Sequence, residues 1–233
     1  MKKIRVLKVE FENEVQVYEI PAFRAAVIEQ TGRQFDMFHN HADNMSIYRY
    51  PLIQYKRIFR HPAIICIDEG VDHLHHFFEN KGQIIFLGDK EYELKVGKLN
   101  LNQFTMQVWE TMFYYTIENW IALNEENYSK YRKIDVLKEQ IEFLEKTLTA
   151  NILAFAKGIE WNVDKEIQVN ILSLDESRII KVKNNRFSAF NATFKTNVFL
   201  PNFIGLGKSV SKGFGTVKQK KRDNNEKNIS YGR

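Results

Sequence analysis

The sequence predicts an α+β protein made of two tandem ferredoxin-like domains, in each of which strands and helices follow the order βαββαβ. Three observations predict this fold. Segments with apolar residues at alternate positions recur in both halves, amphipathic segments lie between them, and 233 residues suffice for two domains of about 100 to 120 residues. We expect the domains at residues 1–97 and 98–217, followed by a basic disordered tail at residues 218–233.

The first half begins with an alternating strand and then a helix that has the residues typical of both helix ends. Pro21 stands where the fixed φ of proline suits a first turn, and Gly32 stands where a left-handed cap would lie. A later short helix would turn Leu74, Phe77 and Phe78 inward. In order, the predicted elements are a strand at residues 2–11, a helix at 21–32, strands at 46–59 and 62–68, a short helix at 70–82, and strands at 83–88 and 91–97.

The second half repeats this plan with a longer first helix. Ile134, Leu137 and Ile141 begin an apolar series at spacings of three and four residues that continues to Ile152, which is the period of an amphipathic helix. In order, the predicted elements are a strand or strand pair at residues 104–123, a helix at 124–158, and strands at 167–174, 177–183 and 186–200.

Basic residues are segregated along the chain, which carries a formal net charge of +5. Residues 177–222 contain eleven of the 34 Lys and Arg and no Asp or Glu, so the remaining 23 basic residues face 29 acidic ones. A second window without acidic residues, 44–67, interleaves basic and aromatic side chains. Such fields attract polyanions, and aromatic rings stack on unpaired bases, so the distribution favours nucleic acid over a merely solvated basic surface.

The cysteine content and the hydropathy bound where the protein works. Cys66 is the one cysteine and lies in an apolar run, so we expect a buried thiol, no disulfide framework and a cytoplasmic protein. No stretch approaches the ~18 to 20 apolar residues of a membrane span, and the first residues lack the apolar core of a signal peptide. We expect no membrane partner.

Four of the eleven glycines lie in the segment NFIGLGKSVSKGFGTV, residues 202–217. It fits neither of two phosphate-binding motifs, because a Walker loop requires glycine where Asn202 stands and a dinucleotide fingerprint requires a small residue where Val210 stands. Two interpretations remain. Either N–H groups exposed by the glycines bind phosphates together with Lys208 and Lys212, or the segment is a structural turn that packs one half against the other.

The pattern GLGKSVSKGFG, two GxG pairs near the C-terminus after a tandem ferredoxin-like plan, resembles the CRISPR-associated endoribonucleases of the RAMP superfamily. These enzymes cut precursor CRISPR RNA within its repeats. The resemblance covers most of the chain and implies that CRISPR repeat RNA is the partner and that no cofactor is needed. It also implies metal-independent cleavage, in which the 2′-hydroxyl of the RNA attacks the adjacent phosphate and leaves a 2′,3′-cyclic phosphate and a 5′-hydroxyl.

The same resemblance implies a general base or acid histidine shortly after the first helix, where His39 and His41 stand. An extended segment would point both rings to one side, and imidazoles with a pKa of about 6.5 suit proton transfer at a phosphate ester. Other branches of the family pair one histidine with tyrosine and lysine, parts that Tyr48 and Lys56 would take. Lys56 or Arg49 would stabilise the charge of the phosphorane.

The expected RNA-binding residues come from the basic windows and from the glycine-rich segment. They are Arg49, Arg57, Arg60, Arg178, Lys181, Lys183, Arg186, Lys195, Gly205, Gly207, Lys208, Ser209, Ser211, Lys212, Gly213 and Gly215. Membership of a CRISPR effector complex and a homodimer are left open as further partners.

Two alternatives are kept. A non-cleaving RNA-binding subunit of a CRISPR effector complex would share the fold, and its function would not depend on the histidines. A metal-dependent hydrolase would begin its site with His39 and His41 or use Asp72, His73, His75 and His76, but no cysteine cluster or HExxH motif accompanies them. We therefore expect the side chains of the second group on the solvent side of a helix, without a bound metal.

Overall fold

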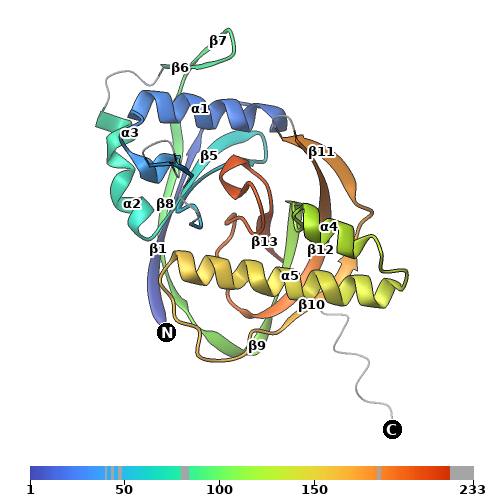
Figure 1. The fold of residues 1–233 in the computed structure, drawn as a ribbon. Helices are drawn as coiled ribbons and strands as arrows, with labels where there is room; N and C mark the ends of the chain where they lie inside the picture. Colours follow the sequence, from blue (N-terminus) through green and yellow to red (C-terminus); the bar gives the residue numbers. More distant parts are fainter. Residues whose placement is uncertain (40, 43–44, 47–48, 80–83, 183–184, 221–233) are drawn as a thin grey trace.

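Two large antiparallel sheets, each with helices on one face, form most of the protein, and two short two-stranded sheets lie outside them (Figure 1). The computed structural model describes residues 1–39, 49–79, 84–182 and 185–220, together with the backbone of residues 41–42 and 45–46. Within these ranges, every helix is too short or too polar to cross a lipid bilayer. The predicted class, α+β with tandem ferredoxin-like domains, is confirmed by the strand order of both sheets.

The first domain is built from a four-stranded sheet. Its elements are β1 (Lys2–Phe11), the 3₁₀ turn η1 (Val17–Glu19), α1 (Ile20–Thr31), the 3₁₀ turn η2 (Asp36–Phe38), β2 (His41–Ala42), β3 (Met45–Ser46), β4 (Ile53–Ile58), β5 (His61–Ile67), α2 (Glu69–His73), α3 (His75–Glu79), β6 (Ile84–Leu87), β7 (Lys90–Glu93) and β8 (Val96–Met106). The sheet order is β4–β5–β1–β8, all antiparallel. These are the second, third, first and fourth strands of a βαββαβ unit.

Aromatic side chains join the first sheet to its helices. Phe11 of β1 packs edge-to-face against Phe23 of α1 and Phe77 of α3, with ring centroids 5.9 and 6.3 Å apart. The predicted helix at 70–82 is instead the pair α2 and α3. The N–H groups of Leu74 and Phe77 bond three residues back, and this tighter turn leaves Phe78 39% exposed rather than facing inward.

Cys66, in β5 next to β1, is fully buried, as predicted. Burial raises the pKa of its thiol, because the charged form loses its hydration. The residue therefore acts as a packed core side chain.

The second domain repeats the plan. Its elements are β9 (Val108–Trp120), α4 (Glu125–Tyr131), α5 (Leu137–Gly158), β10 (Val169–Leu174), β11 (Arg178–Val182), β12 (Asn185–Val198), the 3₁₀ turn η3 (Val210–Lys212) and β13 (Thr216–Lys220). The sheet order is β10–β12–β9–β13, and β11 pairs with the first part of β12. The amphipathic helix is confirmed as α5, which buries Leu144, Leu148 and Ile152. The predicted apolar series begins too early, because Ile134 precedes α5 and Leu137 is 65% exposed. The predicted span 124–158 is broken after α4, where the Gln140 amide donates to the Ile134 carbonyl at 2.6 Å.

The division between the domains lies after β8. This strand pairs with β1 along its whole length, from Val96 beside Phe11 to Met106 beside Lys2. The expected boundary at Gly97 would cut β8 at its second residue, so the first domain extends nine residues further. At the other end, β13 includes residues 218–220, which we had expected in the tail, because Lys218 to Lys220 pair with β9.

Residues 205–215, hereafter the glycine loop, stand where a βαββαβ unit would have its second helix. The loop is bonded to β4 and to the residues just before it. Gln54 accepts from the Gly205 N–H at 2.9 Å, and the Tyr50 hydroxyl donates to the Gly205 carbonyl at 2.7 Å. The interpretation of this segment as a turn that packs one half against the other is therefore correct for its main chain.

Glycine is required in the loop because other atoms occupy the space of a side chain. A Cβ on Gly215 would lie 1.9 Å from the Leu206 carbonyl oxygen, and φ there is +62°. A Cβ on Gly205 would lie 2.5 Å from Val210 Cβ and 2.8 Å from Lys56 Nζ. The loop closes on itself and on β4 at distances that no larger residue permits.

Substitution of these glycines tests this packing. Gly88 has φ +65° but open space around its Cβ position, so Gly88→Ala adds the cost of left-handed φ alone, about 1 kcal/mol. Gly215→Ala adds a main-chain clash and should lower the free energy of unfolding by about 3 kcal/mol or more. Urea unfolding of both variants measures the difference, and equal losses would contradict the packing described here.

Candidate nucleic-acid interface

His39 follows η2 and is held by main-chain groups on two sides. Its Nε2 lies 2.8 Å from the carbonyl oxygen of Arg33, and its own carbonyl accepts from the Arg24 guanidinium at 3.0 Å. A carbonyl can only accept, so Nε2 carries the proton and Nδ1 is the acceptor nitrogen of the neutral ring. The His39 side chain is 12% exposed, so one edge of an oriented imidazole reaches the surface.

Three predicted residues lie wholly or partly outside the described residues. His41 belongs to β2, where it pairs with Ser46 of β3, but its side chain is outside the described part of the chain. Tyr48 and Lys183 are outside it altogether. The expected convergence of the two histidine rings stays a prediction.

Lys56 is fully buried between the domains. Its Nζ donates to the carbonyl oxygens of Val210 and Phe214 at 3.0 and 3.2 Å, and burial lowers its pKa to about 7. A neutral amine has two hydrogens, which these two carbonyls accept. In this arrangement Lys56 contacts the glycine loop and not solvent, so the geometry favours a positioning role over contact with a substrate.

The glycine loop and the His39 segment both touch β4. The Tyr55 hydroxyl donates to the carbonyl of Phe38 at 3.3 Å, while the Tyr55 carbonyl oxygen lies 3.6 Å from the position that a Cβ would take on Gly213. A single tyrosine therefore spans from the residue before His39 to the loop. The front-half and back-half candidates therefore both contact Tyr55 of β4.

The N–H groups of the loop glycines are largely used within the protein. Those of Gly205, Gly213 and Gly215 donate to Gln54, Val210 and Asn119. The expected nest of free N–H donors does not form at these glycines, because the same donors fix the loop. Among the loop side chains, Lys208 is exposed and Ser209, Ser211 and Lys212 are half-buried, so side chains carry the polar surface that the loop presents.

β11 and β12 form a basic hairpin beside the loop. Lys181 and Arg186 are exposed and stand directly opposite each other across the two strands. Like charges in this position destabilise a sheet, and a bound polyanion removes the repulsion. Lys208 of the loop reaches over the Phe187 ring of β12, at 5.7 Å from its centroid, so the loop contacts the hairpin on the strand face opposite to that of Arg186.

The other predicted basic residues are spread more widely. Arg57 donates to the Val15 carbonyl and Arg60 pairs with Glu14, both toward the turn between β4 and β5. Arg49 contacts Met37 near His39. Lys195 lies on β12 opposite Tyr114 of β9. The structure therefore joins the loop to the hairpin through Lys208 and to the His39 segment through Tyr55, and leaves Arg57 and Arg60 apart.

The histidines of α3 form a group of their own. His75, His76 and Glu79 offer side-chain atoms within 4.8 Å of one another, and among the described residues this is the geometric candidate for a metal site. His76 Nδ1 lies 3.3 Å from Glu79, and Phe35 stacks on the His76 ring at 3.9 Å. The structure therefore brings together two of the four predicted residues of this segment, His75 and His76, with Glu79, which is not among the predicted residues.

Sequence reasoning did not find the residues that fix the loop. Tyr50 and Gln54 are more than 150 positions from Gly205, and such contacts leave no local pattern. Arg24, which holds the His39 carbonyl, sits in a helix that reads as ordinary packing. In the sequence, the aromatic and basic run before and within β4 is the feature that points to this region.

Two family models match the chain along its length. Residues 2–105 match the Cas6b N-terminal domain and residues 107–220 match the Cas6b C-terminal domain. The two ranges meet where β8 ends and β9 begins.

Solved structures and a sequence relative agree with these matches. A crystal structure of Cas6b superposes with a TM-score of 0.84 at 25% identity, over 94% of this chain and all of that one. A structure of a CRISPR RNA processing endoribonuclease Cas6b, with a TM-score of 0.71, 24% identity and the same coverage, supports the fold. An uncharacterized protein of Methanocaldococcus jannaschii is 40% identical over 111 residues, which are 47% of this chain and 74% of that protein.

The burial of Lys56 predicts a specific pH dependence of stability. Its folded pKa of about 7 lies below the unfolded value of about 10.4, so the unfolded chain binds more protons between these values and the contribution of Lys56 to stability rises with pH. The stability of wild type relative to Lys56→Met should therefore increase from about pH 7 to about pH 9.5 in urea unfolding. Lys98→Met, which removes an exposed lysine of β8, is the matched control, and a pH-independent difference for Lys56→Met would contradict its burial.

Proposed function

The chain belongs to the Cas6b family, and we propose that it is an endoribonuclease that cuts precursor CRISPR RNA within its repeats. The 2′-hydroxyl of the RNA attacks the adjacent phosphorus, the bond from phosphorus to the 5′-oxygen breaks, and the products end in a 2′,3′-cyclic phosphate and a 5′-hydroxyl. No metal ion takes part in this reaction. The protein acts on RNA in the cytoplasm.

One observation carries the proposal: β4 touches both the His39 segment and the glycine loop. Tyr55 contacts Phe38 with its hydroxyl and lies beside Gly213 with its main chain. A phosphate near His39 would thus lie close to the glycine loop. Proton transfer and charge stabilisation require such proximity.

His39 acts as the general base in this proposal. In this role the His39 ring takes the proton of the 2′-hydroxyl, and the bond between Nε2–H and the Arg33 carbonyl orients the ring. His41 is proposed as the acid that protonates the departing 5′-oxygen. The Nε2 contact fixes the ring orientation, as a carboxylate or carbonyl does for other catalytic histidines.

Lys56 and the basic hairpin have separate tasks. Lys56 positions the loop through Val210 and Phe214. Lys208, Lys181 and Arg186 hold the phosphates of the repeat, and the shape of the RNA or its unpaired bases give selection. A catalytic part for Tyr48 stays a prediction.

Substitution of His39 tests the enzymatic claim. His39→Ala should slow cleavage of the cognate repeat RNA by about 10² or more, with little change in RNA affinity. Single-turnover rates and filter-binding affinities measure the two quantities. Unchanged cleavage would favour the alternative, a non-cleaving RNA-binding subunit of a CRISPR effector complex.

His61→Ala is the matched control, because the His61 ring also bonds to main-chain carbonyls, those of Glu12 and Asn13, but on the far end of the β4–β5 hairpin. It should cleave at the wild-type rate. The thermal stability of both variants shows whether either ring acts only by holding the main chain.

Removal of metal ions and of the 2′-hydroxyl tests the proposed cleavage reaction. Cleavage should persist in EDTA and should cease when hydrogen replaces the 2′-hydroxyl at the scissile nucleotide, because that oxygen is the nucleophile. Mass spectrometry of the products should show a 2′,3′-cyclic phosphate. Inhibition by EDTA would instead point to a metal ion and to His75, His76 and Glu79.

A further inference from the structure

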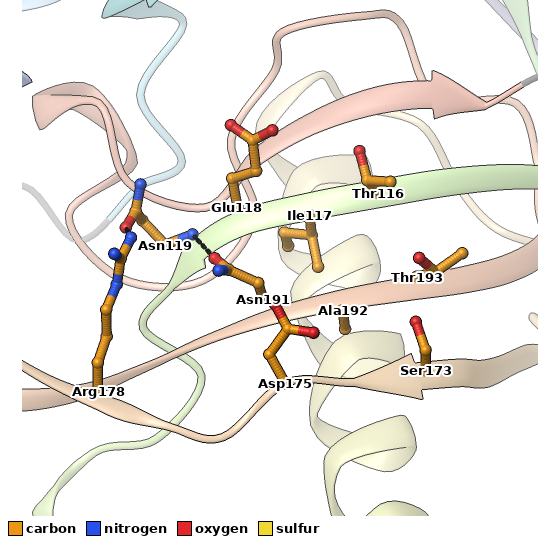
Figure 2. Close-up of a pocket in the computed structure, with 10 residues that line it drawn as sticks. All are labelled: Thr116, Ile117, Glu118, Asn119, Ser173, Asp175, Arg178, Asn191, Ala192 and Thr193. Carbon is orange, nitrogen blue, oxygen red and sulfur yellow. Dashed lines mark hydrogen bonds between the residues drawn. The ribbon is translucent and has the colours of Figure 1, made fainter.

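A polar pocket of about 320 Å³ opens on the face of the second sheet that α5 does not cover (Figure 2). On β9, Tyr115 and Ile117 are fully buried toward the helix, so Thr116 and Glu118 point to the opposite face. Figure 2 shows Arg178 and Asn119 on one side of Asn191, with Ser173 and Thr193 on the other.

The pocket exists because the strands on both sides of β12 lose their regular pairing beside Asn191. In β9, Ile117 pairs with Ala192 and Trp120 with Phe190, so Glu118 and Asn119 together face only Asn191. This is a β-bulge, and Asn119 has φ +53°. On the other side β10 ends at Leu174 and β11 begins at Arg178, so the three residues between them leave the sheet.

Asn119 joins the pocket to both elements that are proposed to hold RNA. Its main-chain carbonyl accepts from the Gly215 N–H of the glycine loop at 3.0 Å. Its side-chain oxygen accepts from the guanidinium of Arg178, the first residue of the basic hairpin. A strand of RNA held by the loop and the hairpin would therefore pass over this pocket.

The floor and wall of the pocket offer both donors and an acceptor. The Asn191 side-chain oxygen is taken by the Asn119 N–H at 2.9 Å, which leaves the Asn191 amide N–H groups as donors. The Asp175 main chain is fixed by its N–H bond to the Asn191 carbonyl at 2.9 Å, and both residues line the pocket. Glu118, the other acid at the pocket, is paired with Lys218 at 2.6 Å. Of the two carboxylates that line the pocket, Asp175 is thus the one without an ion pair among the described residues.

We propose that this pocket binds one unpaired guanine of the repeat RNA, with Asp175 as the residue that selects it. The inference rests on the proposed function, because the glycine loop and the hairpin deliver the base. A volume of about 320 Å³ lies at the low end of ligand pockets and suits a single base.

Guanine is selected because of the arrangement of its donors. Its N1–H and N2–H groups are adjacent, so a carboxylate accepts both, while the Asn191 amide donates to O6. Adenine and cytosine place an acceptor nitrogen beside their single amino group, and uracil flanks its N–H with two carbonyl oxygens. Each of these would set a lone pair against the Asp175 carboxylate.

Short RNA probes test the selection on the full chain. We would compare hexanucleotides UUGUUU, UUIUUU and UUAUUU, where I is inosine, which lacks only the N2 amino group of guanine. All sugars would carry 2′-fluoro groups so that cleavage cannot consume the probe. Fluorescence anisotropy should show about fivefold to tenfold tighter binding of the guanine probe than of the inosine probe, because one of two paired hydrogen bonds is lost.

Two variants assign the effect to the pocket. Asp175→Asn replaces one acceptor oxygen by a donor and should reduce the preference for guanine over inosine to less than about twofold. Glu176→Gln removes the same charge from the next exposed residue, which does not line the pocket, and should keep the preference.

The outcomes separate this inference from the proposed function. Equal binding of the three probes by wild type, or a guanine preference that survives Asp175→Asn, would overturn the guanine pocket and leave RNA cleavage standing. Failure of every probe to bind would contradict the proposed RNA interface and the pocket together.

Discussion

A buried amine between two carbonyl oxygens fixes the two domains relative to each other. The Lys56 side chain extends from β4 of the first domain and donates to the carbonyl oxygens of Val210 and Phe214 in the second. Among the described residues, no carboxylate bonds to this amine. Burying an amine is unfavourable unless its hydrogens are accepted, so these carbonyls must stay in place. Gln54 and Tyr50 complete the attachment at Gly205.

This attachment decides which groups remain for RNA. The main chain of the glycine loop is committed to Gln54, Asn119 and to the loop itself, so side chains such as Lys208 carry its outward charge. Lys181 and Arg186 stand opposite each other across two strands, and their repulsion lowers the stability of the protein without RNA. This arrangement is well suited to a polyanion. Its phosphates would relieve the repulsion between Lys181 and Arg186, while the hydrogen bonds of the glycine loop keep the main chain in place.

Local patterns predicted the fold and the candidate segments, and contacts distant in sequence escaped them. The βαββαβ order, the apolar stripe of α5 and the buried Cys66 follow from periodicity and composition, and the comparisons confirm the family that the glycine pattern indicated. The partner of each loop glycine did not follow, because Tyr50 and Gln54 bond across more than 150 positions. The sequence predicts that Lys56 acts at the phosphate, and only the tertiary structure reveals it as a buried donor. The bulge at Asn119 also depends on β12, its neighbour in the sheet.

The central claim is that the His39 segment and the glycine loop flank one scissile phosphate. The most direct measurement is photo-crosslinking with a repeat RNA that carries 4-thiouridine beside the scissile phosphate and a 2′-deoxy sugar that blocks cleavage. The account predicts that mass spectrometry of the crosslinked protein finds peptides from both the segment after α1 and residues 205–215. Crosslinks confined to one of these two segments, or to neither, would contradict it.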